Sequence, residues 1–131
     1  MSGLVDTSVV VRYLTGDPPE LAERAARILD GEEGLLVPAV VIAEAAYVLT
    51  SVYGVDREAA VDSLIDLIQK ENLCPLDLGK TFVIEGLLLC RPSARVSFAD
   101  ALIWAAARSN DIERIYTLDR RFPDLEVELR D

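Results

Sequence analysis

Short apolar segments alternate with longer helical patterns along this chain, and this alternation limits its fold more than any other feature. The apolar runs lie at residues 4–5, 35–37, 73–76 and 115–117, and a last short strand is expected around 126–129. Between them, apolar residues recur at the spacing of a helix. Strands that are joined through helices form parallel sheets by right-handed crossovers. The sequence therefore predicts an α/β fold, a three-layer α/β/α sandwich with a central parallel sheet.

Proline and glycine mark several boundaries of the expected elements. Pro38 opens a long helix that Gly54 stops near Tyr53, and Pro75 favours an edge position for the third strand. A further helix is expected over residues 98–109. The chain shows no repeat and no linker, so residues 1–131 are expected to form a single domain.

Composition excludes several kinds of protein chemistry. No apolar run is long enough to span a bilayer, and no signal-peptide pattern is present, so we expect a cytoplasmic protein without a membrane partner. The chain has no histidine and only two cysteines, which excludes a Ser-His-Asp or Cys-His nucleophile and disfavours zinc. The formal net charge of -10 argues against simple electrostatic adhesion to nucleic acid.

Two aspartates directly follow expected strands. Asp6 ends the first apolar run, and Asp119 comes just after the strand at 115–117. Parallel sheets bind their ligands outside the carboxyl ends of the strands, which makes both residues candidates for function. The alternatives are that Asp6 caps the helix that follows it and that Asp119 is an ordinary turn aspartate.

Two further acids lie in apolar helical segments. Glu44 is the only charged residue between Leu35 and Thr50, so we expect a buried carboxylate that needs a partner or a metal. The alternative is that it pairs with a distant arginine or faces a solvent gap. Asp100 lies in a largely apolar turn, but it also stands three residues after Ser97, the spacing of a capping box.

Taken together, Asp6, Glu44, Asp100 and Asp119 form a coherent set of oxygen ligands. Carboxylates that lie close together repel one another unless a cation neutralises them. Oxygen-only ligands favour Mg²⁺ or Mn²⁺ over zinc. Such a site suits phosphoryl transfer, in which the metal contacts phosphate oxygens and activates a water molecule.

The same residues occur in a recognisable order. They are Val5-Asp6-Thr7-Ser8 with Tyr13-Leu14, Glu44 with Tyr47-Val48-Leu49, Phe98-Ala99-Asp100-Ala101, and Thr117-Leu118-Asp119 with Phe122. This ordered set, spread over nearly the whole chain, resembles the PIN-domain ribonucleases, and among them the VapC toxins of bacterial and archaeal toxin–antitoxin pairs.

The resemblance implies a sheet of strand order 3-2-1-4-5 and Mg²⁺- or Mn²⁺-dependent endonuclease action on RNA. It places Asp6, Glu44, Asp100 and Asp119 in the metal site as catalytic residues, with Asp6 and Asp100 as the most direct ligands. It also places Ser8 and Thr117 beside that site as supporting polar residues. It implies a homodimer and a cognate antitoxin whose C-terminal segment covers the active site.

RNA must still reach an acidic site on an acidic protein. We expect phosphate contacts from Arg91, Arg95, Arg120 and Arg121, which flank the helix and strand that carry two of the acids. The alternative is that these arginines are solvated and pair with surface acids. Two other functions remain open: a catalytically inactive PIN-like binding module, and an Asp-dependent phosphatase. The phosphatase would need a second acid where this chain has Ser8.

Overall fold

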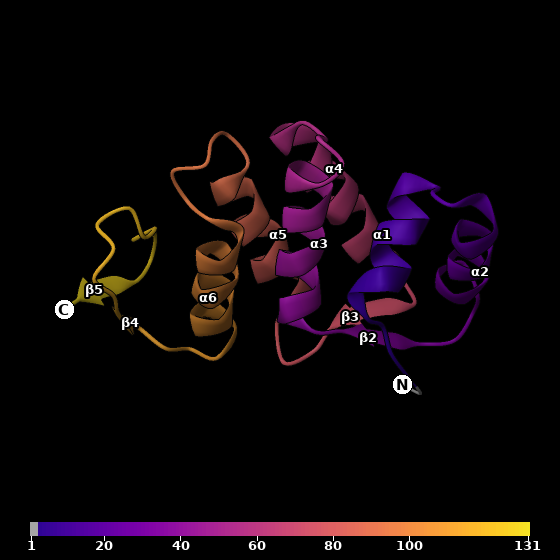
Figure 1. The fold of residues 1–131 in the computed structure, drawn as a ribbon. Coiled ribbons are helices and arrows are strands. Elements are labelled where there is room, and N and C mark those ends of the chain that lie inside the picture. Colours follow the sequence, from indigo (N-terminus) through magenta and orange to yellow (C-terminus); the bar gives the residue numbers. More distant parts are fainter. Residues whose placement is uncertain (1–2) are drawn as a thin grey trace.

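The computed structural model describes residues 3–131. Its elements are β1 (Gly3–Leu4), α1 (Thr7–Thr15), α2 (Pro19–Leu29), β2 (Leu35–Val37), α3 (Ala39–Ser51), α4 (Arg57–Ile68), β3 (Leu73–Pro75), α5 (Lys80–Cys90), α6 (Phe98–Ser109), β4 (Arg114–Tyr116) and β5 (Glu128–Arg130). The helices lie side by side, with α2 near one end of the molecule and β4 and β5 at the other (Figure 1). The expected α/β class is confirmed: the strands are parallel and six helices accompany them.

The strands form two separate parallel sheets. One has the order β1-β2-β3, with Leu4 opposite Leu36, and the other pairs β4 with β5. Pro75 ends β3 at an edge, as its missing N–H predicts. The expected order 3-2-1-4-5 is thus present in two parts, 3-2-1 and 4-5. This corrects the expectation of one continuous sheet, because within residues 3–131 β1 pairs with β2 alone and β4 with β5 alone.

Local chemistry sets the ends of the helices that position the candidate site. Asp6 caps α1 through its side chain, and α1 ends at Gly16, whose φ of 69° suits a residue without a Cβ. Ser97 caps α6 by accepting a hydrogen bond from the backbone N–H of Asp100. No helix in the described part of the chain combines the length and apolar character needed to cross a membrane.

A single core joins the helices to the sheets. Trp104 of α6 is fully buried, and its indole N–H donates to the backbone oxygen of Leu125, 2.8 Å away. Phe122 and Ile115 are buried in the same core. Helix α6 packs very closely on α5, since a Cβ added to Gly86 would lie 2.7 Å from the backbone oxygen of Ala101. The β4–β5 unit is therefore fixed to α6 by core contacts.

Candidate active site

Asp6 lies just beyond β1 and is the N-cap of α1. Its Oδ1 accepts hydrogen bonds from the Ser8 hydroxyl at 2.7 Å, from the Ser8 N–H at 3.0 Å and from the Val9 N–H at 3.4 Å. These donors stabilise the ionised form, so the pKa of Asp6 is lowered, mainly by the Ser8 hydroxyl. The capping role is confirmed. It leaves an ionised, exposed carboxylate at the end of the strand.

Glu44 is exposed, which corrects the expectation that it is buried. It lies on the same face of α3 as Val40 and Tyr47, whose side chains are also exposed. An apolar sequence around the helix led to the wrong expectation, because this face has no neighbour packed over it. The Glu44 carboxylate instead accepts a hydrogen bond from the Thr7 hydroxyl at 2.5 Å.

Asp6 and Glu44 line one open hollow of about 540 Å³ between α1 and α3. Its other lining residues are Thr7, Ser8, Val11, Arg12, Val48, Val52 and Tyr53. Arg12, one of these lining residues, donates hydrogen bonds to the Tyr53 hydroxyl at 3.1 Å and to the backbone oxygen of Asp17 at 3.2 Å. The residues that line the hollow therefore bring two carboxylates, three hydroxyl groups and one guanidinium group.

Asp100 and Asp119 lie outside that hollow. Asp100 is half-buried in the first turn of α6, where the Ser97 cap confirms half of the capping-box arrangement. Asp119 lines a different hollow, of about 380 Å³, beside β4 and β5. Its Oδ1 accepts from the Arg121 N–H at 2.8 Å, which lowers its pKa. Thr117 accepts from the Asp119 N–H at 3.0 Å and so supports that turn.

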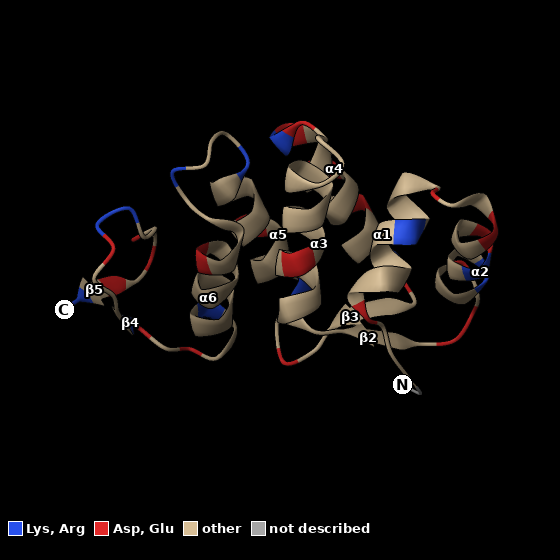
Figure 2. Cartoon of the chain, in the orientation of Figure 1, with Lys and Arg blue, Asp and Glu red and all other residues tan. Residues whose placement is uncertain are grey.

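The four acids are therefore not gathered within one chain. Across residues 3–131, no three acids, histidines or cysteines lie close enough to hold one metal ion. Figure 2 shows acidic positions just before α1, in α3, in α6 and in the C-terminal loop, spread along the length of the molecule. Two of them do suit a hard cation, because Mg²⁺ is commonly held by one or two carboxylates and keeps several water ligands. Asp6 and Glu44 fit that description by their chemistry and by their shared hollow.

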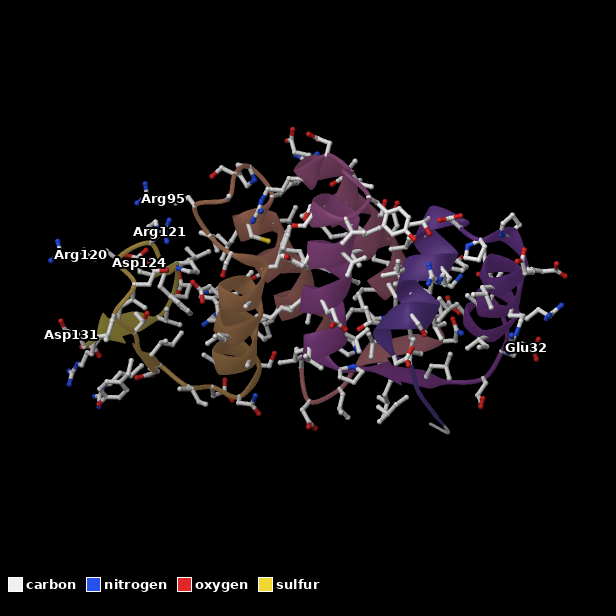
Figure 3. All side chains as sticks on the ribbon, in the orientation of Figure 1. Glu32, Arg95, Arg120, Arg121, Asp124 and Asp131 are labelled. Carbon is white, nitrogen blue, oxygen red and sulfur yellow. The ribbon has the colours of Figure 1, made fainter. Side chains whose placement is uncertain are left out.

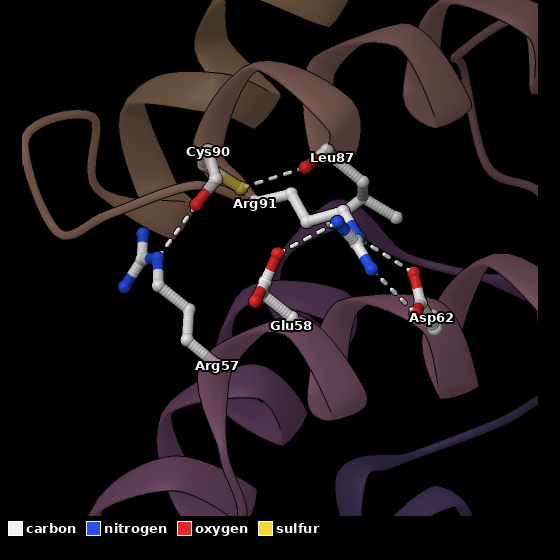
Figure 4. A network of polar contacts seen from close by, with 6 residues as sticks. All are labelled: Arg57, Glu58, Asp62, Leu87, Cys90 and Arg91. Atoms are coloured by element: carbon white, nitrogen blue, oxygen red, sulfur yellow. Dashed lines mark hydrogen bonds and ion pairs between the residues drawn. The ribbon is translucent and has the colours of Figure 1, made fainter.

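Arg91 is already engaged by two acids. Its guanidinium group contacts Asp62 at 2.8 and 2.9 Å and Glu58 at 2.8 Å (Figure 4). This pairing lowers the pKa of Asp62. It favours the alternative that Arg91 is a surface ion-pair partner rather than a phosphate contact.

The other expected arginines lie at the β4–β5 end of the molecule. Figure 3 shows Arg95, Arg120 and Arg121 at that end and Glu32 at the other end of the molecule. Arg121 approaches the Asp119 carboxylate at 3.4 Å. In the described part of the chain, neither Arg95 nor Arg120 forms an ion pair, and both are exposed. Their guanidinium groups are free to meet a phosphate.

Sequence reasoning missed two supporting residues. Thr7 is not among the site residues expected from the sequence, yet its hydroxyl donates a hydrogen bond to Glu44. Arg57 donates to the backbone oxygens of Cys90 and Val96, each at 2.6 Å, and lies 4.1 Å from the ring centre of Phe98. It thereby fixes the loop that leads to α6. No local signal could reveal either contact, since each joins residues more than 30 positions apart.

Comparison with known proteins agrees with the order of these motifs. No curated protein matches the chain. The family model of the PIN domain matches residues 3–128, which include the β1-β2-β3 sheet, β4 and all four acids. PIN domains are generally nucleases, and those nucleases typically use Mg²⁺ or Mn²⁺. From the motif order, the parallel α/β fold and this match over nearly its whole length, we conclude that the chain belongs to the PIN domain family.

Proposed function

We propose that this PIN-domain protein is a Mg²⁺- or Mn²⁺-dependent endoribonuclease that hydrolyses RNA phosphodiester bonds. The observation that carries the proposal is that Asp6 and Glu44 line the same hollow. The chain has no histidine to act as a general base, so its acids are the natural source of hydrolytic chemistry. Family membership supports the same reaction class.

The residues of the hollow have separate roles in this proposal. Asp6 and Glu44 would hold the cation through their carboxylate oxygens. Ser8 and Thr7 orient those carboxylates through the hydrogen bonds already formed. When bound, the cation would neutralise phosphate charge and lower the pKa of a water ligand. Arg12, which also lines the hollow, would contact the phosphate backbone of the substrate.

We further propose that the nuclease is the toxin of a toxin–antitoxin pair and acts as a homodimer. Two features support this assignment: the ordered motifs that resemble VapC toxins, and the net charge of -10. An antitoxin segment that carries an arginine would complement the acids of the hollow, and its binding would block access of RNA. The complex should therefore be inactive while the free toxin cleaves RNA.

The experiment is cleavage of a structured RNA mixture by the purified protein in Mg²⁺, in Mn²⁺ and in chelator. Asp6→Asn is the test variant, because asparagine caps helices about as well as aspartate and the fold should survive. Asp56→Asn is the matched control, an N-cap aspartate of α4 whose side chain makes no capping bond and lies outside the hollow. We expect metal-dependent cleavage by the wild type and by Asp56→Asn, and none by Asp6→Asn.

Separate results would support the other two functions. A catalytically inactive binding module is favoured by the separation of Asp119 from the hollow. It would bind RNA without cleaving it, and Mg²⁺ would leave its melting temperature unchanged. A phosphatase would release phosphate from small phosphomonoesters. The structure speaks against it, because Ser8 serves as a hydrogen-bond donor to Asp6 where a second acid is required.

A further inference from the structure

Both sheets of this molecule end in a strand with a free edge. β1 hydrogen-bonds to β2 alone and β4 to β5 alone within residues 3–131. The residues at these edges are apolar and exposed: Leu4 is 64% exposed in β1 and Tyr116 is 67% exposed in β4. Free edges of this kind present unpaired backbone N–H and C=O groups that readily accept another strand.

The divided sheet also divides the acids. Asp6 follows β1 and lines one hollow, whereas Asp119 follows β4 and lines the other. In a parallel sheet, the carboxyl ends of neighbouring strands lie side by side at the same end of the sheet. Asp6 is two residues past Leu4, and Asp119 is three residues past Tyr116. Pairing β4 beside β1, with these strand ends in register, would bring Asp119 to Asp6 and Glu44.

The β4–β5 unit does not reach β1 of its own chain. Trp104 and Phe122 hold the unit on α6, and α6 packs on α5 without room for a Cβ at Gly86. Figure 1 shows α6, α5 and α3 between the β4–β5 unit and β1. While these core contacts persist, a strand for β1 has to come from another molecule.

We propose that this strand is β4 of a second copy of the chain. Two copies related by a two-fold axis would each add β4–β5 to the other's β1, which gives two sheets of order 3-2-1-4′-5′, where the prime marks the second copy. Each active site would then combine Asp6 and Glu44 of one copy with Asp119 of the other. This inference rests on the proposed nuclease function for the role of the composite site, but the strand exchange itself does not.

The surfaces that would meet are complementary. Leu118, 91% exposed, would approach the apolar edge at Leu4 and the uncovered face of α3 at Val40 and Tyr47. Arg120 is exposed and forms no ion pair in the described part of the chain, and it would enter beside the carboxylates of the hollow. A homodimer that exchanges identical elements in this way needs no partner of different sequence.

The first test reads strand exchange by cross-linking and does not depend on activity. Leu4→Cys and Tyr116→Cys are placed on separate full-length chains that carry tags of different size. Both chains also carry Cys74→Ser. The two chains are co-expressed, and the protein is treated with a short bismaleimide. We expect a cross-linked pair that contains both tags. The positive control is Leu4→Cys with Leu36→Cys in one chain, because these residues are already opposite each other in β1 and β2.

Two results of this test overturn the inference. If Leu4→Cys with Tyr116→Cys in one chain yields only an internal cross-link at monomer mass, then β4 closes on its own β1. If neither arrangement cross-links while the control does, then β4 does not reach β1 at all. Native mass spectrometry of the wild type adds a check. Strand exchange requires a dimer, so a protein that is monomeric would contradict it.

The second test reads the composite site. Asp6→Asn and Asp119→Asn are each expected to be inactive alone. In a mixed dimer one site carries both changes and the other carries neither, so co-expression should restore about a quarter of the wild-type activity. No restoration, with an active wild type, would overturn the inference. An inactive wild type would instead contradict the proposed nuclease function, and the cross-link would still decide the exchange.

Discussion

The hydroxyl oxygen of Thr7 lies 2.5 Å from Oε1 of Glu44, and this contact joins the start of α1 to the middle of α3. It brings the Glu44 carboxylate into the hollow that is also lined by Asp6, the residue directly before Thr7. Asp6 is held in turn by Ser8. Two consecutive hydroxyl residues thus orient the two carboxylates that this chain brings together.

Replacing Thr7 with valine should weaken metal binding while lowering the stability of the fold only modestly. Valine keeps the shape of the side chain but removes the hydrogen bond to Glu44, which is exposed and can be solvated instead. We expect an unfolding free energy lower by about 1 kcal/mol or less and a Mg²⁺ affinity reduced about fivefold. Calorimetric titration and thermal melting measure the two effects. Thr50→Val is the control, because that hydroxyl bonds only within α3. An equal loss of metal affinity in both variants would contradict the role of Thr7.

Replacing Ser8 with alanine should change the titration of Asp6. The Ser8 hydroxyl is the main cause that lowers the pKa of Asp6 below its ordinary value of 3.8. A lowered pKa contributes stability that is present above that ordinary value and is lost as the pH falls through the folded pKa. Without the hydroxyl, the pKa of Asp6 should rise toward its ordinary value, so this contribution to stability should become smaller and its loss should be complete at a higher pH. Carboxyl NMR shifts measure it, with Asp119 as the internal control because Arg121 sets its pKa.

Local patterns predicted the elements of this fold better than the contacts between them. The sequence predicts a strand at 35–37 and a helix at 98–109, and the structure has both at those bounds. Turn residues and caps act on their immediate neighbours, so their effect can be read from a short window. Ser97 and Pro75 are examples.

The exposure of Glu44 and the division of the sheet could not be predicted from such a short window. Whether the α3 face at Val40 and Tyr47 is covered depends on elements far away in the chain. The apolar composition of α3 gives the same pattern in either case. Likewise, β1 and β4 each have the sequence of an ordinary strand, and nothing within either segment indicates which strand will pair with it. The candidate acids could therefore be named from the sequence, but their assembly could not.

Gly86→Ala should destabilise the protein although alanine favours helices. The new Cβ would lie 2.7 Å from the backbone oxygen of Ala101, so α5 and α6 would have to separate. We expect a loss of about 1–3 kcal/mol in the unfolding free energy, measured by urea denaturation. Gly79→Ala is the control, because its nearest neighbour at 3.2 Å is the movable side chain of Phe82. A Gly86→Ala protein as stable as the wild type would contradict the close packing of these helices.

Replacing Arg57 with methionine should loosen the loop before α6. The variant keeps an unbranched apolar stem but loses both hydrogen bonds to the oxygens of Cys90 and Val96 (Figure 4 shows the first). These bonds involve a charged donor, and we expect a loss of about 2 kcal/mol in stability. Amide hydrogen exchange should become faster over residues 91–97. Arg95→Met, at an exposed position of the same loop, should leave that exchange rate unchanged.

Arg120 and Arg121 should contribute to RNA affinity and to its dependence on salt concentration, whereas Arg91 should contribute to neither. Arg91 is neutralised by Asp62 and Glu58, so Arg91→Ala should leave RNA binding nearly unchanged. Arg120 is free, and Arg121 contacts Asp119 only at 3.4 Å. Each lost phosphate contact should lower the salt slope of binding by about 0.7 for single-stranded RNA. Binding is measured over a salt series in chelator with the Asp6→Asn protein, so that no cleavage interferes. If the double alanine variant and Arg91→Ala bind with the same affinity and slope as the parent, these arginines do not contact RNA and serve as solvated surface charge.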